Sequence, residues 1–247
     1  MKNISIEKLL KKFPKKRGSL SPGLKKQFDK HYKDNRENTV SQLFESWGHR
    51  TIKGGKKNIL ELGAGTLNHL KYIKDIENKF YDIIEPKKFL YKHKKETTKI
   101  RKAFKKLSDT PANFYDQIIS IMVLEHLTHL PHILAISALK MKKGGSQSHS
   151  IPCQGQPVWD ISWSLFNFNF YFKTGYSFKE IQRHEHVNSY DEIISLIKYF
   201  YHEINIKFSY PLFLNKYTSF YANITFAKPR LKNCKNYLKK IKNKSML

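Results

Sequence analysis

The stretch Lys57-Asn-Ile-Leu-Glu-Leu-Gly-Ala-Gly-Thr-Leu-Asn-His69 decides the fold, because it joins a short apolar run to two closely spaced glycines. Residues 59–62 are typical of a strand that is buried on both faces. Gly63 and Gly65 allow a sharp turn and a close approach of the backbone to a ligand. Asn68 stands where the dinucleotide fingerprint has its third glycine, which disfavours a bound pyrophosphate. We therefore expect a parallel sheet whose first strand leads into a ligand-binding turn.

Two further apolar runs follow at the spacing of a nucleotide-binding α/β unit. Residues 80–86 end a second strand at Glu85, at the distance from the glycine turn where a ribose-binding carboxylate is expected. Residues 115–124 are apolar without alternation and lead into Glu125-His126-Leu127. A helical stretch at 131–142 then precedes a last strand that stops at Pro152. The polar residues that end these strands should meet at one edge of the sheet.

In their order, these motifs resemble those of the class I S-adenosylmethionine-dependent methyltransferases. The resemblance covers residues 55–152 and implies a Rossmann-like, doubly wound α/β fold with a mostly parallel seven-stranded sheet. It also implies S-adenosylmethionine as the cofactor, with Asp109 as a loose candidate for the acid that binds adenine. The other cofactor-binding residues that the resemblance implies are Glu61, Gly63, Gly65, Glu85 and Ser120.

The bulk composition agrees with a single cytoplasmic enzyme. A chain of 247 residues is long enough for one α/β domain with additions. Its two cysteines, Cys153 and Cys234, are too few for a disulfide framework or a structural zinc site. No run approaches the roughly 18 apolar residues of a membrane span. The Lys-rich start also lacks the apolar core of a signal peptide.

The net charge of +26 would ordinarily indicate a nucleic acid or an anionic membrane as partner. Of the 46 basic residues, however, only six are arginine, whose guanidinium group dominates specific recognition of phosphates and bases. Two basic clusters stand out, at residues 87–106 and from residue 228 onward. We interpret most of the charge as a solvated Lys-rich surface.

We expect three parts in the chain. Residues 1–54 form a helical N-terminal extension or lid, in which Arg36 is a candidate to contact the substrate. Residues 55–228 form the methyltransferase domain, in which residues 153–204 are a substrate-side insertion after the fifth strand. Residues 229–247 form a basic tail that is disordered or a frayed helix.

The insertion is rich in aromatic side chains. We expect most of them to form a small core, and Trp159 or Trp163 to line a cavity for the acceptor. The nine aromatic residues of this segment are Trp159, Trp163, Phe166, Phe168, Phe170, Tyr171, Phe172, Tyr176 and Phe178.

The motif Arg183-His-Glu-His-Val-Asn188 lies just before a predicted helix start, because residues 189–192 have the Ser-x-x-Glu form of a capping box. This position favours His184 and Asn188 as substrate contacts, with structural hydrogen bonding as the alternative. On an extended backbone, His184 and His186 would share one face. The spacing is not that of H-E-x-x-H and no third ligand stands out nearby, so we expect no metal site.

Methyl transfer from a sulfonium requires mainly that the acceptor atom is held close to the methyl group and in line with the departing sulfur. A hydroxyl acceptor must also lose a proton, for which a histidine of near-neutral pKa is suited. We expect His126 to be this base, with His186 as the second candidate. His149, within the last predicted strand, is expected to be structural.

Two motifs, His-Glu-His-Val-Asn at 184–188 ahead of an Ile-rich helix and Glu-x-Trp-x-His-Arg at 45–50 before the core, resemble those of a bacterial subgroup of these methyltransferases. Members of this subgroup often accompany surface-polysaccharide genes. The resemblance favours transfer to an oxygen or nitrogen atom of a small molecule, such as a sugar or surface-glycan precursor. The alternatives are an RNA or DNA methyltransferase that uses the basic surface, a non-catalytic binding module, and a dehydrogenase. The end of the fourth predicted strand, Ser120-Ile-Met-Val123, has no Asn/Asp-Pro-Pro-Tyr motif, which disfavours base methylation.

Overall fold

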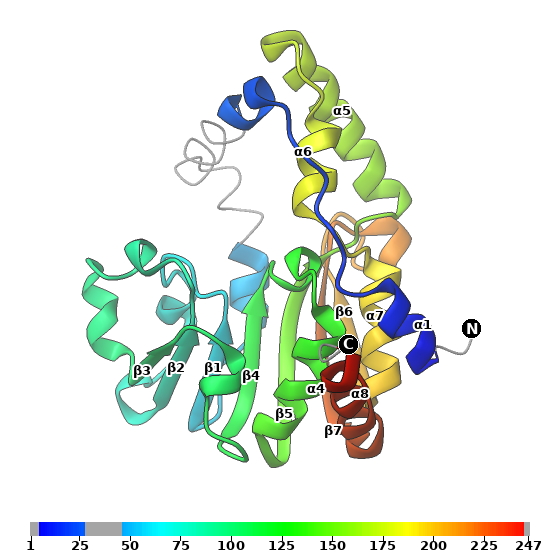
Figure 1. The fold of residues 1–247 in the computed structure, drawn as a ribbon. Helices are drawn as coiled ribbons and strands as arrows, with labels where there is room; N and C mark the ends of the chain where they lie inside the picture. The colour runs from blue at the N-terminus through cyan, green and yellow to red at the C-terminus, as the bar shows by residue number, and fades with distance from the viewer. Residues whose placement is uncertain (1–4, 28–45, 245–247) are drawn as a thin grey trace.

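The computed structural model describes residues 5–27 and 46–244 and is built around a seven-stranded sheet (Figure 1). The strand order is β3-β2-β1-β4-β5-β7-β6. The strands are β1 (Asn58–Leu62), β2 (Phe80–Ile84), β3 (Lys102–Phe104), β4 (Tyr115–Ile121), β5 (Met141–Pro152), β6 (Tyr201–Phe208) and β7 (Tyr221–Pro229).

The sheet is parallel except for one strand. β1 pairs in parallel with β2 on one side and β4 on the other, so the strand order reverses at β1. β7 runs antiparallel to both β5 and β6. Ligands of open α/β sheets bind outside the carboxyl ends of the strands at such a reversal point. The predicted fold is confirmed, and the reversal indicates where its site lies.

The segments outside the strands include α-helices and short 3-10 helices. The α-helices are α1 (Ile6–Lys12), α4 (Leu130–Lys140), α5 (Pro157–Thr174), α6 (Phe178–Glu185), α7 (Tyr190–Phe200) and α8 (Leu231–Lys244). Residues 22–27 and 46–51 are also helical. The 3-10 helices are η1 (Leu70–Tyr72), η2 (Ile76–Asn78), η3 (Lys88–Leu90), η4 (Lys95–Lys99), η5 (Leu107–Asp109), η6 (Leu124–His126) and η7 (Lys216–Thr218).

Two hydrophobic cores lie on the two faces of the sheet. Leu60 and Ile118 face the larger core, which contains buried side chains of α4, α7 and α8. Their strand neighbours Ile59 and Ile119 face the smaller one, which is closed by η1, η2 and Ile52. Successive side chains of a strand point to opposite faces, so apolar runs without alternation place one set in each core.

The C-terminal segment differs from the predicted tail. α8 packs on the larger core with Cys234 and Tyr237 buried and with Leu238 and Ile241 partly buried. These four residues recur at the spacing of one helix face. The dense lysines conceal this stripe in the sequence. α8 is therefore a structural helix of the domain.

The insertion after β5 divides into two parts. α7 belongs to the main layer, because Ile193, Ile197 and Phe200 are fully buried in the larger core. α5 and α6 form a hairpin above the carboxyl edge of the sheet, meaning the edge where the parallel strands end (Figure 1). The insertion that rises from the fold is thus shorter than the predicted residues 153–204.

The α5–α6 hairpin has its own small core. Phe170, Phe178 and Ile181 pack there with Leu24 from the helical residues 22–27. Not all aromatic residues of the insertion are buried as expected: Phe168 and Phe172 are 65% and 71% exposed. No helix in the described part of the chain is long and apolar enough to cross a membrane.

Candidate active site

The glycine turn ties together the ends of three neighbouring strands. The N–H of Gly63 donates to the carbonyl oxygen of Ile84 at 2.8 Å. Gly63 has φ of +66°, and a Cβ at this residue would lie 2.7 Å from Cγ2 of Val123, just beyond β4. The ends of β1, β2 and β4 therefore meet at the carboxyl edge, as the sequence predicts.

Glu85 holds its carboxylate beside this turn. One oxygen accepts a hydrogen bond from the N–H of Gly65 and the other from the N–H of Lys87, both at 2.9 Å. A carboxylate has about four acceptor positions, so each oxygen can accept one more bond. The two backbone N–H groups thus fix the orientation of the Glu85 carboxylate and leave it able to accept hydrogen bonds from a ligand.

Glu61 and Ser120 point into the fold instead of toward this edge. The hydroxyl of Tyr81 donates to Oε2 of Glu61 at 2.7 Å, and burial raises the pKa of Glu61 to about 7. Ser120 is fully buried and shares a 2.7 Å hydrogen bond with Nδ1 of His149. Both residues support the strands that carry the site, and neither is presented to a ligand in this conformation.

Asp109 does not lie at the carboxyl edge. Its neighbours on either side, Ser108 and Thr110, accept hydrogen bonds from Nζ of Lys140 at the end of α4. α4 ends where β5 begins, which is the opposite edge of the sheet. The expectation that Asp109 binds adenine is therefore wrong, because the chain crosses to the other edge directly after β3.

The η6 turn is held by the segment that precedes α7. The backbone N–H groups of Val187 and Asn188 both donate to the carbonyl oxygen of Glu125, at 2.9 and 3.1 Å. The side-chain amide of Asn188 donates to the carbonyl oxygens of Leu124 and Leu127 at 2.9 and 2.8 Å. Asn188 is fully buried. The amide nitrogen is committed to the turn, so Asn188 positions η6, while its Oδ1 is buried and has no hydrogen-bond partner among the described residues.

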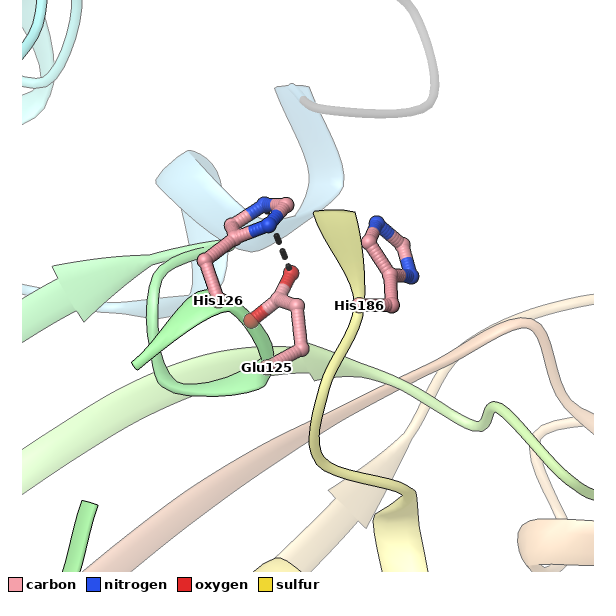
Figure 2. Close-up of side chains that lie close together, drawn as sticks. All are labelled: Glu125, His126 and His186. Atoms are coloured by element: carbon pink, nitrogen blue, oxygen red, sulfur yellow. Dashed lines mark ion pairs between the residues drawn. The ribbon is translucent and has the colours of Figure 1, made fainter. Parts of the chain in front are cut away.

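Glu125, His126 and His186 come together at this turn (Figure 2). Nε2 of His126 lies 3.9 Å from Oε1 of Glu125, and the two imidazole rings meet edge to face with centroids 4.8 Å apart. Burial raises the pKa of Glu125 to about 7 and lowers that of His186 to about 3. His186 is therefore neutral at physiological pH, which favours the role of hydrogen-bonding or ligand group over that of base.

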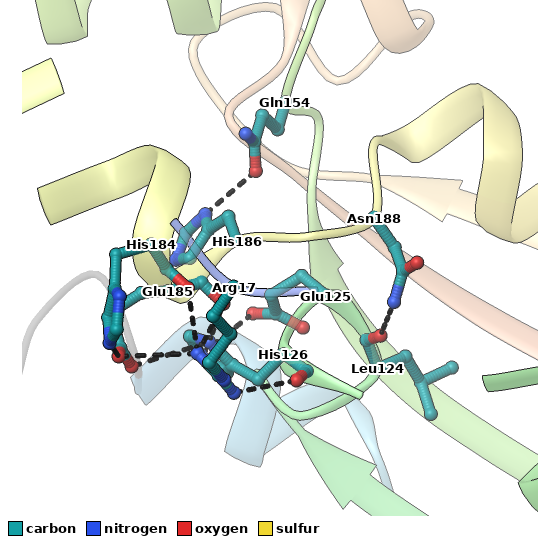
Figure 3. Close-up of polar contacts among 9 residues, drawn as sticks. All are labelled: Arg17, Leu124, Glu125, His126, Gln154, His184, Glu185, His186 and Asn188. Carbon is teal, nitrogen blue, oxygen red and sulfur yellow. Dashed lines mark hydrogen bonds and ion pairs between the residues drawn. The ribbon is translucent and has the colours of Figure 1, made fainter. Parts of the chain in front are cut away.

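The motif around His186 is helical as far as Glu185, and the extended backbone begins only at His186. His184 lies in the last turn of α6 and its Nδ1 bonds to the carbonyl oxygen of Gly18, whereas His186 turns toward Gln154 (Figure 3). The two histidines therefore do not share a face. The predicted capping box is also absent, because Ser189 makes no side-chain cap and Glu192 pairs with lysines of the N-terminal segment.

Arg17 is a site residue that the sequence analysis missed. Its guanidinium donates to the carbonyl oxygens of His126 and His184 at 2.8 and 2.9 Å, and it forms an ion pair with Glu185 (Figure 3). Lys15 similarly donates to the carbonyl oxygen of Val187. The N-terminal segment thus fastens η6 to α6. These partners lie more than 100 residues apart, and no local pattern signals the contact.

Trp159 is the aromatic residue of the insertion that reaches the trio. It is 3% exposed and its ring stacks near His186, with centroids 6.4 Å apart. No described residue accepts a hydrogen bond from its indole N–H. Trp163 instead stacks on Phe178 in the hairpin core. Arg36, the remaining predicted substrate contact, lies outside the described residues.

Comparisons with known proteins agree with this geometry. Residues 26–193 match a family model described as a methyltransferase domain. The chain belongs to this methyltransferase family. The predicted family and enzyme class are confirmed, and so is S-adenosylmethionine as the methyl donor. Among curated proteins, no sequence matches this chain.

Several solved structures share the methyltransferase fold at low sequence identity. A methyltransferase from Archaeoglobus fulgidus is 14% identical, with a TM-score of 0.55 over 76% of this chain and 94% of that one. A possible histamine N-methyltransferase from Thermotoga maritima is 12% identical, with a TM-score of 0.53 over 82% and 95%. Phosphoethanolamine N-methyltransferase 2 from Haemonchus contortus is 11% identical, with a TM-score of 0.52 over 78% and 53%. Sequence identity this low shows a shared fold and no more.

Proposed function

We propose that this methyltransferase transfers the methyl group of S-adenosylmethionine to an oxygen or nitrogen atom of a small molecule, such as a sugar or surface-glycan precursor. The observation that carries the proposal is the trio of Glu125, His126 and His186 beside the glycine turn. Trp159 and the segment around Arg17 cover this trio. A partly buried group of polar side chains beside an aromatic ring suits a small polar acceptor.

The cofactor would lie along the carboxyl edge between the glycine turn and Glu85. Glu85 would accept hydrogen bonds from the ribose hydroxyls, while Gly63 and Gly65 leave room for the methionine part of the cofactor. This arrangement directs the sulfonium toward the end of β4, where η6 begins.

The reaction is an in-line displacement at the methyl carbon. The C–S bond breaks with its electron pair going to sulfur, and a bond forms between the methyl carbon and the acceptor oxygen or nitrogen. A hydroxyl acceptor also gives up its proton. Of the two histidines in the trio, His186 is a weak base because burial lowers its pKa to about 3, so we assign the proton transfer to the partly exposed His126.

The distribution of the basic clusters favours a small acceptor over a nucleic acid. Residues 87–106 comprise η3, η4 and β3 at the β3 end of the sheet, whereas α8 lies beside α4, away from that end (Figure 1). A nucleic acid would need these clusters to join into one track toward the site. Two of the structural neighbours also carry the names of small-molecule N-methyltransferases.

The test is formation of S-adenosylhomocysteine with separate acceptor pools. Nucleotide sugars, sugar phosphates and small amines form one set, and total RNA and single-stranded DNA form the other. We expect turnover with the first set. His126→Ala should bind S-adenosylmethionine as wild type does and slow turnover roughly 100-fold or more.

His202→Ala is the matched control, because this histidine lies exposed on β6. It should leave turnover unchanged. Turnover with nucleic acid alone, or an unaltered rate in His126→Ala, would contradict the proposal.

A further inference from the structure

Glu125, His126 and His186 each present one possible ligand atom, and these three atoms lie within 4.8 Å of one another (Figure 2). Ligand atoms bound at about 2.1 Å in a tetrahedral arrangement lie about 3.4 Å apart. The three side chains would therefore close around an ion by small rotations of about an ångström. The trio joins residues that are about 60 positions apart in the chain, which explains why the sequence analysis found no third ligand.

Hydrogen bonds fix the tautomer of both histidines. Nδ1 of His126 lies 2.9 Å from the carbonyl oxygen of Glu185, and Nδ1 of His186 lies 2.8 Å from Oε1 of Gln154. Both partners are acceptors only, so each Nδ1 must carry the proton and donate it. In the neutral imidazole, Nε2 then keeps a free lone pair. Metal-binding histidines are oriented by this kind of hydrogen bond from the other ring nitrogen.

Glu125 supplies the second observation that points to a cation. Its side chain is 1% exposed, and Oε2 has no hydrogen-bond partner among the described residues. Oε1 faces Nε2 of His126 at 3.9 Å, so a carboxylate oxygen faces a nitrogen lone pair. Two electron-rich atoms at this separation repel unless a proton or a metal cation lies between them, and a buried carboxylate oxygen without a hydrogen bond is costly.

The charges around the trio leave one negative charge for such a cation. Glu185 approaches Nδ1 of His126 at 3.7 Å, but it also forms an ion pair with Arg17 at 3.3 Å. The charges of Glu185 and Arg17 therefore offset each other. Glu125 is then the uncompensated acid of the cluster, and it is aimed at the space between the two imidazoles (Figure 2).

We infer that Glu125, His126 and His186 bind a divalent transition-metal ion. Two imidazole nitrogens and one carboxylate oxygen are ligands that suit Zn²⁺, Mn²⁺, Fe²⁺ or Co²⁺, whereas Mg²⁺ and Ca²⁺ prefer all-oxygen sites. Three protein ligands leave at least one coordination position open. Gln154 and the backbone of Glu185 are the groups that orient the two histidines.

The open coordination position can be filled by the hydroxyl group of the acceptor, and this role of the ion rests on the proposed function. An acceptor hydroxyl that coordinates the ion has a lowered pKa, loses its proton to water and attacks the methyl carbon as an oxyanion. His126 then serves as a ligand, and the ion removes the need for a free imidazole base. The substrate class would be a small molecule with a metal-binding hydroxyl.

The test is a titration of untagged, chelator-treated full-length protein with Zn²⁺ by calorimetry, and with Co²⁺ by visible absorption. We expect one ion per chain and visible d–d bands in the Co²⁺ complex. His186→Ala and Glu125→Gln should each weaken Zn²⁺ binding at least tenfold. Gln154→Ala, which leaves all three ligands in place, should weaken it by about tenfold through the loss of orientation.

His202→Ala and His93→Ala are matched controls that remove an exposed histidine outside the site, and both should bind Zn²⁺ as wild type does. Far-ultraviolet circular dichroism and S-adenosylmethionine binding verify that each variant is folded. Absence of a one-to-one complex in wild type, or equal Zn²⁺ affinity in His186→Ala, Glu125→Gln and the controls, would overturn the site.

The two proposals fail separately. Loss of Zn²⁺ binding with intact S-adenosylmethionine binding would overturn the metal site and leave the proposed function standing. Failure to bind S-adenosylmethionine with an intact Zn²⁺ complex would overturn the proposed function and leave the metal site standing.

Discussion

At the residue scale, the buried carboxyl group of Glu61 has a raised pKa. Glu61 is 2% exposed, and it accepts a hydrogen bond from the hydroxyl of Tyr81. Burial and the neighbouring charge of Glu85 raise its pKa from the ordinary 4.5 to about 7. The folded state therefore holds a proton on Glu61 over a pH range in which the unfolded state has released it.

This shift predicts how the free energy of unfolding depends on pH. Between pH 4.5 and 7 the folded state binds more protons, so raising the pH destabilises it, by up to about 3 kcal/mol from this residue. Glu61→Gln keeps an acceptor for Tyr81 and removes the charge. Urea unfolding at pH 5 and pH 8 should show the variant gaining stability relative to wild type as the pH rises. An equal difference at both pH values would contradict the raised pKa.

At the element scale, the glycine turn and η6 form one unit. A Cβ at Gly63 would meet Val123, and the segment before α7 holds the next residues through Asn188. Gly65 differs from Gly63 because a Cβ there would meet nothing within 4 Å. The two glycines have similar positive φ angles, +66° and +52°, but only one of them is also required by packing.

Alanine at these two positions should therefore have unequal effects. Gly65→Ala adds backbone strain of about 1 kcal/mol, whereas Gly63→Ala adds a clash with Val123 to the same strain. Thermal unfolding should show the larger loss of melting temperature in Gly63→Ala. Val123→Ala should recover part of that loss in a double-mutant cycle. Equal losses in the two variants, without recovery, would show that the contact is unimportant.

The elements that the sequence predicts correctly are those that local pattern determines. The strands β1, β2 and β4 follow from apolar runs, and so does the position of Glu85 directly after β2, beside the glycine turn. The failures concern contacts between distant segments. Glu192 has the pattern of a capping box, but in the fold it pairs with Lys15, and no periodicity predicts an ion pair between segments so far apart.

The candidate site was predicted residue by residue but not as a cluster. His126 and His186 were named for separate reasons, and their meeting with Glu125 depends on how α6 returns over the sheet. Asn188 was placed correctly before a helix, yet its amide serves the backbone of η6. Arg17 carries no local signal. Tertiary packing alone decides which of these polar groups face one another.

At the scale of the whole molecule, the charge distribution conceals the extent of the fold. The chain has a net charge of +26, and its C-terminal lysines suggest a tail, whereas α8 closes the larger core. Tyr237 on this helix is 1% exposed and contacts Phe200 edge to face. The domain therefore extends through α8, and the lysines lie on the outer side of a packed helix.

Truncation of this tyrosine should destabilise the whole domain. Tyr237→Ala removes a fully buried aromatic ring, which costs about 3–5 kcal/mol and lowers the melting temperature by roughly 10 °C. Tyr171→Ala, the same change at a position on α5 that is 54% exposed, is the matched control. Its melting temperature should stay within about 2 °C of wild type. A similar small effect in Tyr237→Ala would indicate a frayed tail.

The cofactor site is tested most directly by a calorimetric titration of the full-length protein with S-adenosylmethionine and, separately, with NAD. Moderate salt limits the contribution of nonspecific charge. We predict saturable one-to-one binding of S-adenosylmethionine alone, weakened about 10- to 100-fold in Glu85→Ala by loss of charged hydrogen bonds and unchanged in the control Glu96→Ala. Folded protein that does not bind S-adenosylmethionine, or binds it equally well without the Glu85 carboxylate, would contradict the assigned cofactor site.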